Sequence, residues 1–221
     1  MTTATSPARS SRTDRASLTR EAILVAAERL FAEHGVFAVS NRQVSEAAGQ
    51  GNNAAVGYHF GTKTDLVRAI EHKHAVPVER LREQRVAEMG DSTELRDWIG
   101  CLVLPLTDHL TALGNPTWYA RFAAQVMADP AYYKTVSRDA LALPALVKVL
   151  EGTSRCLPEL PGNVRTERNI MARNLLIHTC ADYERALAEG SALPPNSWRT
   201  AASGLIDAIV GLWRAPVTRQ A

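Results

Sequence analysis

The chain has 221 residues, of which 46% are hydrophobic and 22% charged, and this composition is typical of a globular protein and excludes a disordered or fibrous one. Its net charge of +2 is too small to indicate a nucleic-acid partner by itself, so that inference has to come from local patterns. No apolar run approaches the roughly 18 residues of a membrane-spanning helix, and the polar N-terminus does not resemble a secretory signal.

The cysteines are few and far apart. Cys101, Cys156 and Cys180 form no CxxC pair, a pattern that favours a reducing compartment and supplies no metal-binding motif. We therefore expect a cytoplasmic protein without a metal or another cofactor.

The first segment, residues 1–17, is rich in Ser, Thr and Arg and has almost nothing to bury, which predicts disorder. The segment contains Arg9, Arg12 and Arg15 but a single acid, Asp14, so it is a basic arm. Such an arm can follow a phosphate backbone or enter a minor groove. The alternative is a tail that only increases solubility.

The first helix is predicted to begin at Thr19 and to end at His34, before Gly35. Its apolar residues recur at the three- and four-residue spacing of one helix face. They are Ile23, Ala26, Ala27, Leu30 and Phe31.

A short second helix follows at residues 41–48. Ser40 and Gln43 have the spacing of a capping box, in which each side chain binds the other's backbone N–H. Gly49 tolerates the left-handed conformation that often ends a helix.

A third helix is predicted at residues 54–60, with Asn53 as its N-cap. Thr62 and Asp65 then resemble a second capping box that opens a longer helix at Lys63. Two short helices joined by a tight, Gly-containing turn form a helix-turn-helix, whose second helix can lie in a DNA major groove.

The remaining sequence is helical in pattern and gives no strand signal. The helix from Lys63 should run to about Val86 and be kinked or broken at Pro77, which lacks a backbone donor. The sequence therefore predicts an all-α fold. Further helices are expected at residues 93–113, 116–128, 131–152, 165–189 and 198–213.

Residues 56–66, which read VGYHFGTKTDL, resemble the end of the recognition helix in TetR-family repressors. The resemblance extends from about Leu18 to Ile70. Gly57 stands where the family often has a second aromatic residue, and the turn at residues 50–53 is one residue longer than usual. The resemblance implies an N-terminal three-helix DNA-binding domain and a larger helical domain that binds a small effector and dimerises.

The resemblance also implies the domain limits. We expect the disordered basic arm at residues 1–17, the helix-turn-helix domain at 18–66 and the effector-binding and dimerisation domain at 67–216.

Candidate DNA contacts lie in and beside the helix-turn-helix. Asn and Gln side chains can pair with adenine, glycine permits close backbone approach, and hydroxyl or cationic groups at the rim can bind phosphates. The candidates are Ser40, Arg42, Gln50, Asn52, Asn53, Ala54, Gly57, Tyr58, His59 and Lys63.

An effector pocket is expected among the later helices, where a few polar groups accompany apolar and aromatic side chains. An ordinary filled core is the alternative. The candidate lining residues are Trp98, Leu102, Trp118, Phe122 and Gln125.

The last two helices carry apolar stripes that suit a homodimer interface. On helix 165–189 a second track, through Met171, Leu175 and His178, is an alternative to the track through Ile177. The candidate interface residues are Ile177, Trp198, Leu205, Ile209 and Leu212.

Glu71, His72 and His74 do not indicate a metal, because residues two apart on a helix point in different directions. A solvated helix face is the preferred interpretation of this group.

We interpret the chain as a homodimeric, non-enzymatic DNA-binding transcriptional regulator. It most resembles a repressor that a small, largely apolar effector releases from a palindromic operator. The alternatives are a constitutive dimeric DNA-binding protein without an effector, and an all-α ligand carrier.

Overall fold

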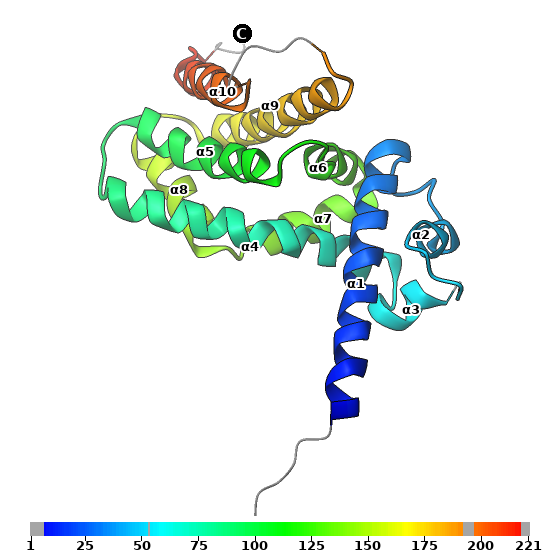
Figure 1. Cartoon of the computed structure of the whole chain (residues 1–221). Coiled ribbons are helices and arrows are strands. Elements are labelled where there is room, and N and C mark those ends of the chain that lie inside the picture. Colours follow the sequence, from blue (N-terminus) through cyan, green and yellow to red (C-terminus); the bar gives the residue numbers. More distant parts are fainter. Residues whose placement is uncertain (1–6, 53, 192–196, 218–221) are drawn as a thin grey trace, which may run out of the picture.

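The computed structural model describes residues 7–52, 54–191 and 197–217, with side chains from Asp14 onward. Within these ranges the chain forms α-helices and no strand, which confirms the all-α prediction. A small unit of three helices lies beside a larger helical body (Figure 1). The helices are α1 (Pro7–His34), α2 (Asn41–Ala47), α3 (Ala55–Phe60), α4 (Lys63–Met89), α5 (Leu95–Leu113), α6 (Tyr119–Ala128), α7 (Pro130–Ala140), α8 (Pro144–Arg155), α9 (Gly162–Ala188) and α10 (Ser197–Arg214).

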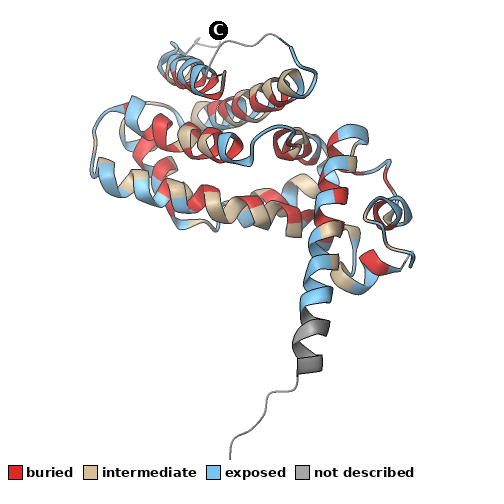
Figure 2. Cartoon of the chain, in the orientation of Figure 1, coloured by how far each residue is buried: buried red, intermediate tan, exposed pale blue. Residues whose placement is uncertain are grey.

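The first helix is much longer than predicted. α1 begins at Pro7, so the prediction of a disordered arm over residues 1–17 is wrong from that residue on. Proline is favoured at the first position of a helix because its φ angle is already helical. The prediction considered only burial, and residues 14–18 are indeed exposed. The N-terminal turns of α1 project away from the rest of the protein (Figures 1 and 2).

The N-terminal unit is built on the apolar face of α1. Ile23, Ala27 and Phe31 are fully buried, and so are Val44 of α2 and Val56 of α3. This face is the one that the helical spacing predicted. The unit therefore has a core of its own, which continues into the larger body as one cluster.

α4 joins the two parts of the chain without interruption. It begins beside α3, contacts α1, and then packs against α5, α7 and α8. The expected break at Pro77 is absent, because the helix continues through this residue to Met89. The limit predicted at residue 66 therefore falls inside a continuous helix.

The predicted helix 131–152 is in fact two helices. α7 ends at Ala140 and α8 begins at Pro144. A residue that precedes proline avoids the α conformation, and Leu143 is extended, with a ψ of 118°. Pro144 therefore starts a new helix rather than continuing the old one.

The other helices cover α4 in layers. α5 packs against α4 on one side and α10 on the other, and α6 lies between α1 and α9 (Figure 1). Trp198, Leu205 and Ile209 of α10 are buried within this single chain. The structure thus assigns three of the five residues predicted for the dimer interface to the core of one subunit. Ile177 and Leu212 are only half-buried.

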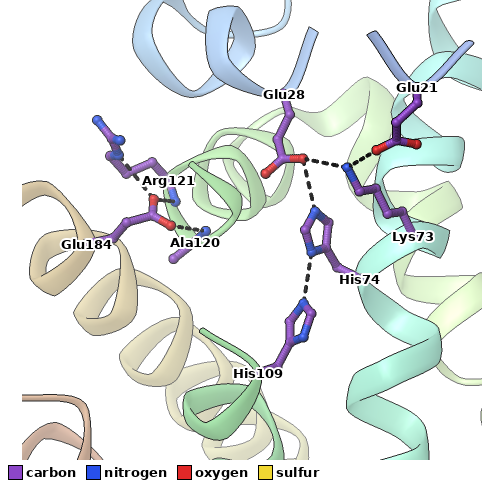
Figure 3. A network of polar contacts seen from close by, with 8 residues as sticks. All are labelled: Glu21, Glu28, Lys73, His74, His109, Ala120, Arg121 and Glu184. Carbon is purple, nitrogen blue, oxygen red and sulfur yellow. Dashed lines mark hydrogen bonds and ion pairs between the residues drawn. The ribbon is translucent and has the colours of Figure 1, made fainter. Parts of the chain in front are cut away.

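Buried carboxylates cap helices that lack caps of their own. α6 has no side-chain cap, but Glu184 of α9 accepts bonds from the backbone N–H groups of Ala120 and Arg121, at 3.1 and 2.9 Å. Glu184 also forms an ion pair with the Arg121 side chain (Figure 3). Glu79 of α4 does the same for α8, where it accepts a 2.6 Å bond from the N–H of Ala145.

We expect replacement of Glu184 to destabilise the protein strongly. Its side chain is 1% exposed, so Glu184→Ala leaves the half-buried Arg121 without its carboxylate and two helix N–H groups without an acceptor. Breaking a buried pair in this way costs about 3–5 kcal/mol. Asp182→Ala is the matched control in the same helix, because its ion pair with Arg185 is exposed and such pairs contribute at most about 1 kcal/mol. Urea denaturation measures both variants, and equal losses would contradict the capping role.

Candidate nucleic-acid interface

α2 begins with the predicted capping box. The hydroxyl of Ser40 accepts a bond from the N–H of Gln43 at 3.2 Å, and the Gln43 side chain accepts one from the N–H of Ser40 at 2.8 Å. Gly49, just beyond the helix, has a φ of 68°, the left-handed conformation that glycine adopts without strain. Both ends of α2 are therefore determined by local sequence.

α3 has one buried and one exposed face, which fix its orientation on the N-terminal unit. Ala55 and Val56 are buried, whereas Gly57 is exposed and Tyr58 is 84% exposed. Asn52 stabilises the preceding turn, since its side-chain oxygen accepts a 2.9 Å bond from the N–H of Ala54. The predicted N-cap, Asn53, lies outside the described residues.

The second capping box is also confirmed. The N–H of Asp65 donates to the Thr62 hydroxyl at 3.1 Å, and the Asp65 carboxylate accepts from the N–H of Thr62 at 3.2 Å. The Thr62 hydroxyl, which also donates to the Asp65 carboxylate at 2.6 Å, and then the Thr62 N–H lower the pKa of Asp65. The end of α3 and the start of α4 are thereby held together.

Lys63 has a role that the sequence did not reveal. Its ammonium group donates to the backbone carbonyls of Val36 and Val39, at 3.1 and 2.6 Å. Burial lowers the pKa of Lys63. Two of its three N–H donors are thus used inside the turn between α1 and α2, so the structure gives no support to its predicted role as a phosphate ligand.

The other DNA-contact candidates are available to different degrees. Arg42 is exposed and forms an ion pair with Glu46, one turn further along the same helix; this bond raises the pKa of Arg42. Gln50 is half-buried and donates to the carbonyl of Ala48. Of the described candidates, those on the surface are Ser40, Arg42, Asn52, Ala54, Gly57 and Tyr58, with His59 half-buried beside them.

Two short helices, each ended by local signals, thus present a small, exposed face on α3. Residues 23–70 match the family model for bacterial regulatory proteins of the tetR family. Over 91 residues the chain is 33% identical to the HTH-type transcriptional repressor AcnR of Corynebacterium glutamicum, covering 39% of this chain and 48% of AcnR. The helix-turn-helix unit of this chain is thus similar to that of TetR-family regulators.

Solved structures of the TetR family share the fold over most of their length. NalD, the secondary repressor of the MexAB-OprM efflux pump of Pseudomonas aeruginosa, is 24% identical with a TM-score of 0.56, covering 88% of this chain and 96% of NalD. PfmR of Thermus thermophilus is 16% identical with a TM-score of 0.53, covering 89% of this chain and 99% of PfmR. At these identities the likeness concerns the fold alone. AcnR is matched over only about half of its length.

The predicted effector residues lie in different parts of the packed helices. Trp98 packs with Cys101 and Val149 in a separate small cluster, whereas Phe122 stacks on Phe31 of α1 with 6.2 Å between ring centroids. Gln125 is exposed. The other two candidates, Leu102 and Trp118, are half-buried around the main core.

A buried polar chain connects the N-terminal unit to the larger body. His74 of α4, 2% exposed, lies 3.0 Å from the Glu28 carboxylate of α1 and 2.9 Å from His109 of α5 (Figure 3). Tyr119 of α6 stacks on the His74 ring, with 3.9 Å between the ring centroids. The preferred interpretation of this part of α4 as a solvated face is thus wrong for His74.

The surroundings determine the protonation of this chain. Burial, and then the neighbouring His74, lower the pKa of His109 to about 4, so His109 is neutral at pH 7. A carboxylate can only accept, so Nε2 of His74 donates to Glu28, and one of the two facing nitrogens, Nδ1 of His74 or Nε2 of His109, donates to the other. Spacing alone could not find this chain, because its members lie on separate helices.

We expect Lys63→Met to reduce stability rather than the salt dependence of DNA binding. The variant removes two bonds to carbonyls from a charged donor, which are worth about 1.5–3 kcal/mol each. The exposed Arg42 is the matched control: Arg42→Ala should flatten the slope of log affinity against log salt by about 0.9. Thermal unfolding and filter binding at several salt concentrations measure the two effects. A slope flattened to the same degree by Lys63→Met would make Lys63 a phosphate ligand.

Proposed function

We propose that the protein is a transcriptional repressor that binds a palindromic operator as a homodimer and is released by a small effector. The observation that carries the proposal is the exposed face of α3, on a helix whose two ends are fixed by local bonds. A short, rigid helix with small and polar side chains outward suits reading of a major groove. The names of AcnR and NalD as repressors favour repression over activation.

We assign base contacts to Asn52 and Tyr58 at this face, and to the predicted contact Asn53, which lies outside the described residues. An Asn side chain can form two bonds with adenine, and Tyr58 is exposed enough to contact either a base or a phosphate. Gly57 has a different proposed role, which is to permit close approach of the DNA. A Cβ atom added to it would meet nothing within 4 Å among the described residues, so packing inside the protein does not require glycine there.

Gly57→Ala separates stability from DNA binding. Alanine favours a helix over glycine by about 1 kcal/mol, so the variant should melt at a higher temperature. If the DNA backbone or bases approach Gly57 closely, operator affinity should fall at the same time, by about tenfold or more, equivalent to about 1.4 kcal/mol. Gly162→Ala, also open to solvent, is the control and should leave affinity unchanged. Fluorescence anisotropy with operator DNA measures the affinity of both variants. An unchanged affinity in Gly57→Ala would mean that the DNA does not approach this residue closely.

The homodimer surface is proposed on the outer side of α9. With much of the α10 stripe buried inside the subunit, the exposed apolar groups of α9 are Ile170 and Met171, at 43% and 52% exposure. His178 lies on the same exposed side as Met171, two turns along. This is the alternative track that the sequence offered, and a two-fold axis would place it against its own copy.

Met171→Asp should therefore separate the subunits without unfolding them. The change places an unpaired charge in an apolar contact of the dimer, while Met171 is exposed in the single chain. Operator affinity should fall steeply, because a monomer binds only one half-site. Leu205→Asp is the comparison and should unfold the subunit, since Leu205 is 3% exposed. Sedimentation velocity measures the separation of the subunits, and circular dichroism measures unfolding. If the Met171→Asp variant remains dimeric, the interface lies elsewhere.

Release by an effector requires coupling between the two sites. If a ligand weakens operator binding tenfold, about 1.4 kcal/mol, the operator must weaken ligand binding by the same factor. A constitutive DNA-binding protein would show no such reciprocity, and an all-α ligand carrier would bind ligand but not DNA. These outcomes distinguish the proposal from its two alternatives.

A further inference from the structure

A cavity of about 420 Å³ lies between α4 and α7, away from the effector residues that the sequence suggested. Ligand sites in proteins are commonly about 300–1,000 Å³ and mostly apolar, with a few polar groups that orient the ligand. Apolar side chains form much of this wall: Ala69, Ala75, Val136, Ala140 and Leu143.

The charged groups of the wall are mainly acidic. Asp65, Glu71 and Asp139 face one cation, Arg68, and the side chain of His72 is exposed. Arg68 bonds to both oxygens of Asp139, at 2.8 and 3.3 Å, and Asp65 is engaged in the capping box with Thr62. Glu71 takes part in neither the Arg68–Asp139 ion pair nor the capping box.

Glu71 has a carboxyl group in an unfavourable position. Its Oε1 atom is buried and has no hydrogen-bond partner among the described residues. Burial raises the pKa of Glu71 to about 7, against a bond from Tyr119 that lowers it, and the neighbouring Glu28 raises it further. A buried carboxylate oxygen without a donor is costly, and a cation with N–H donors would relieve that cost at Oε1.

We propose that this cavity binds a small primary amine with an apolar body, and that Glu71 holds the ammonium group. The apolar wall accommodates the body of the ligand, and the ammonium supplies the donor that Oε1 lacks. The inference rests on the proposed function, because it names the chemical class of the effector and the place where it acts.

The cavity lies next to the DNA-binding unit. Asp65, which lines it, bonds to Thr62 directly after α3. At the other end, Glu71 bonds to Tyr119, which stacks on His74, the partner of Glu28 in α1. A ligand bound at Glu71 would therefore act on the first turns of α4 and on the buried chain to α1.

Calorimetry on the full chain tests the site without DNA. The probe is 3-phenylpropylamine, and the neutral comparison of similar shape is 3-phenylpropan-1-ol. We expect the amine to bind at least tenfold more tightly than the alcohol, and Glu71→Gln to remove that difference. Glu88→Gln is the matched control, since Glu88 lies on α4, is exposed and is outside the cavity wall; it should bind the amine like the wild type.

The pH dependence of amine binding is a second test of the role of Glu71. The amine stays charged between pH 5 and 8, since amines of this kind titrate near the pKa of lysine, about 10.4. Glu71 attracts the ammonium group only when its carboxyl is ionised. The affinity for the amine should therefore be full above the Glu71 pKa of about 7. Below that pH the affinity should fall about tenfold per pH unit, and Glu71→Gln should show no such fall.

Several results would overturn the proposal: no calorimetric binding of the amine, equal binding of amine and alcohol, or wild-type amine affinity in Glu71→Gln. Ala140→Trp, which fills the cavity, should abolish binding of both probes, and persistent binding would place them elsewhere. Anisotropy with operator DNA is the second arm. Amine binding without any operator binding would refute the proposed function while the cavity assignment stands.

Discussion

The structure depends on α4 being one continuous helix shared by both parts of the chain. Its first turn is capped by Thr62 and Asp65 beside α3, and its later turns form the floor on which α5, α7 and α8 pack. A helix that continues through Pro77 transmits a rotation or shift along its length, because its backbone bonds leave little freedom between turns. α4 therefore connects the larger body to the N-terminal unit, in addition to the direct packing of α6 on α1.

Buried polar groups add specific connections to this frame. Glu28, His74 and His109 link α1, α4 and α5, while Glu184 and Glu79 cap α6 and α8 from other helices. Apolar packing alone tolerates small slides between helices, whereas a buried hydrogen bond has one favourable geometry and a high cost when it is broken. These contacts make the helix arrangement geometrically specific.

Local signals in the sequence predicted local structure well. The two capping boxes, the positive φ of Gly49 and the buried faces of α1 to α3 all depend on residues within four positions of one another. The start of α1 was missed because exposure was taken to mean disorder. The division of α7 from α8 was missed because the effect of Pro144 on Leu143 was not weighed.

Capping and helical periodicity are short-range properties, so the all-α class and the helix-turn-helix followed from the order of residues alone. Only the folded chain could establish that Lys63 binds the turn before α2, that His74 is buried, and that much of the α10 stripe packs inside the subunit. An apolar stripe has the same pattern whether it faces the same chain or a second copy. Which of the two it meets depends on contacts between residues far apart in the chain, such as those of α10 with α5.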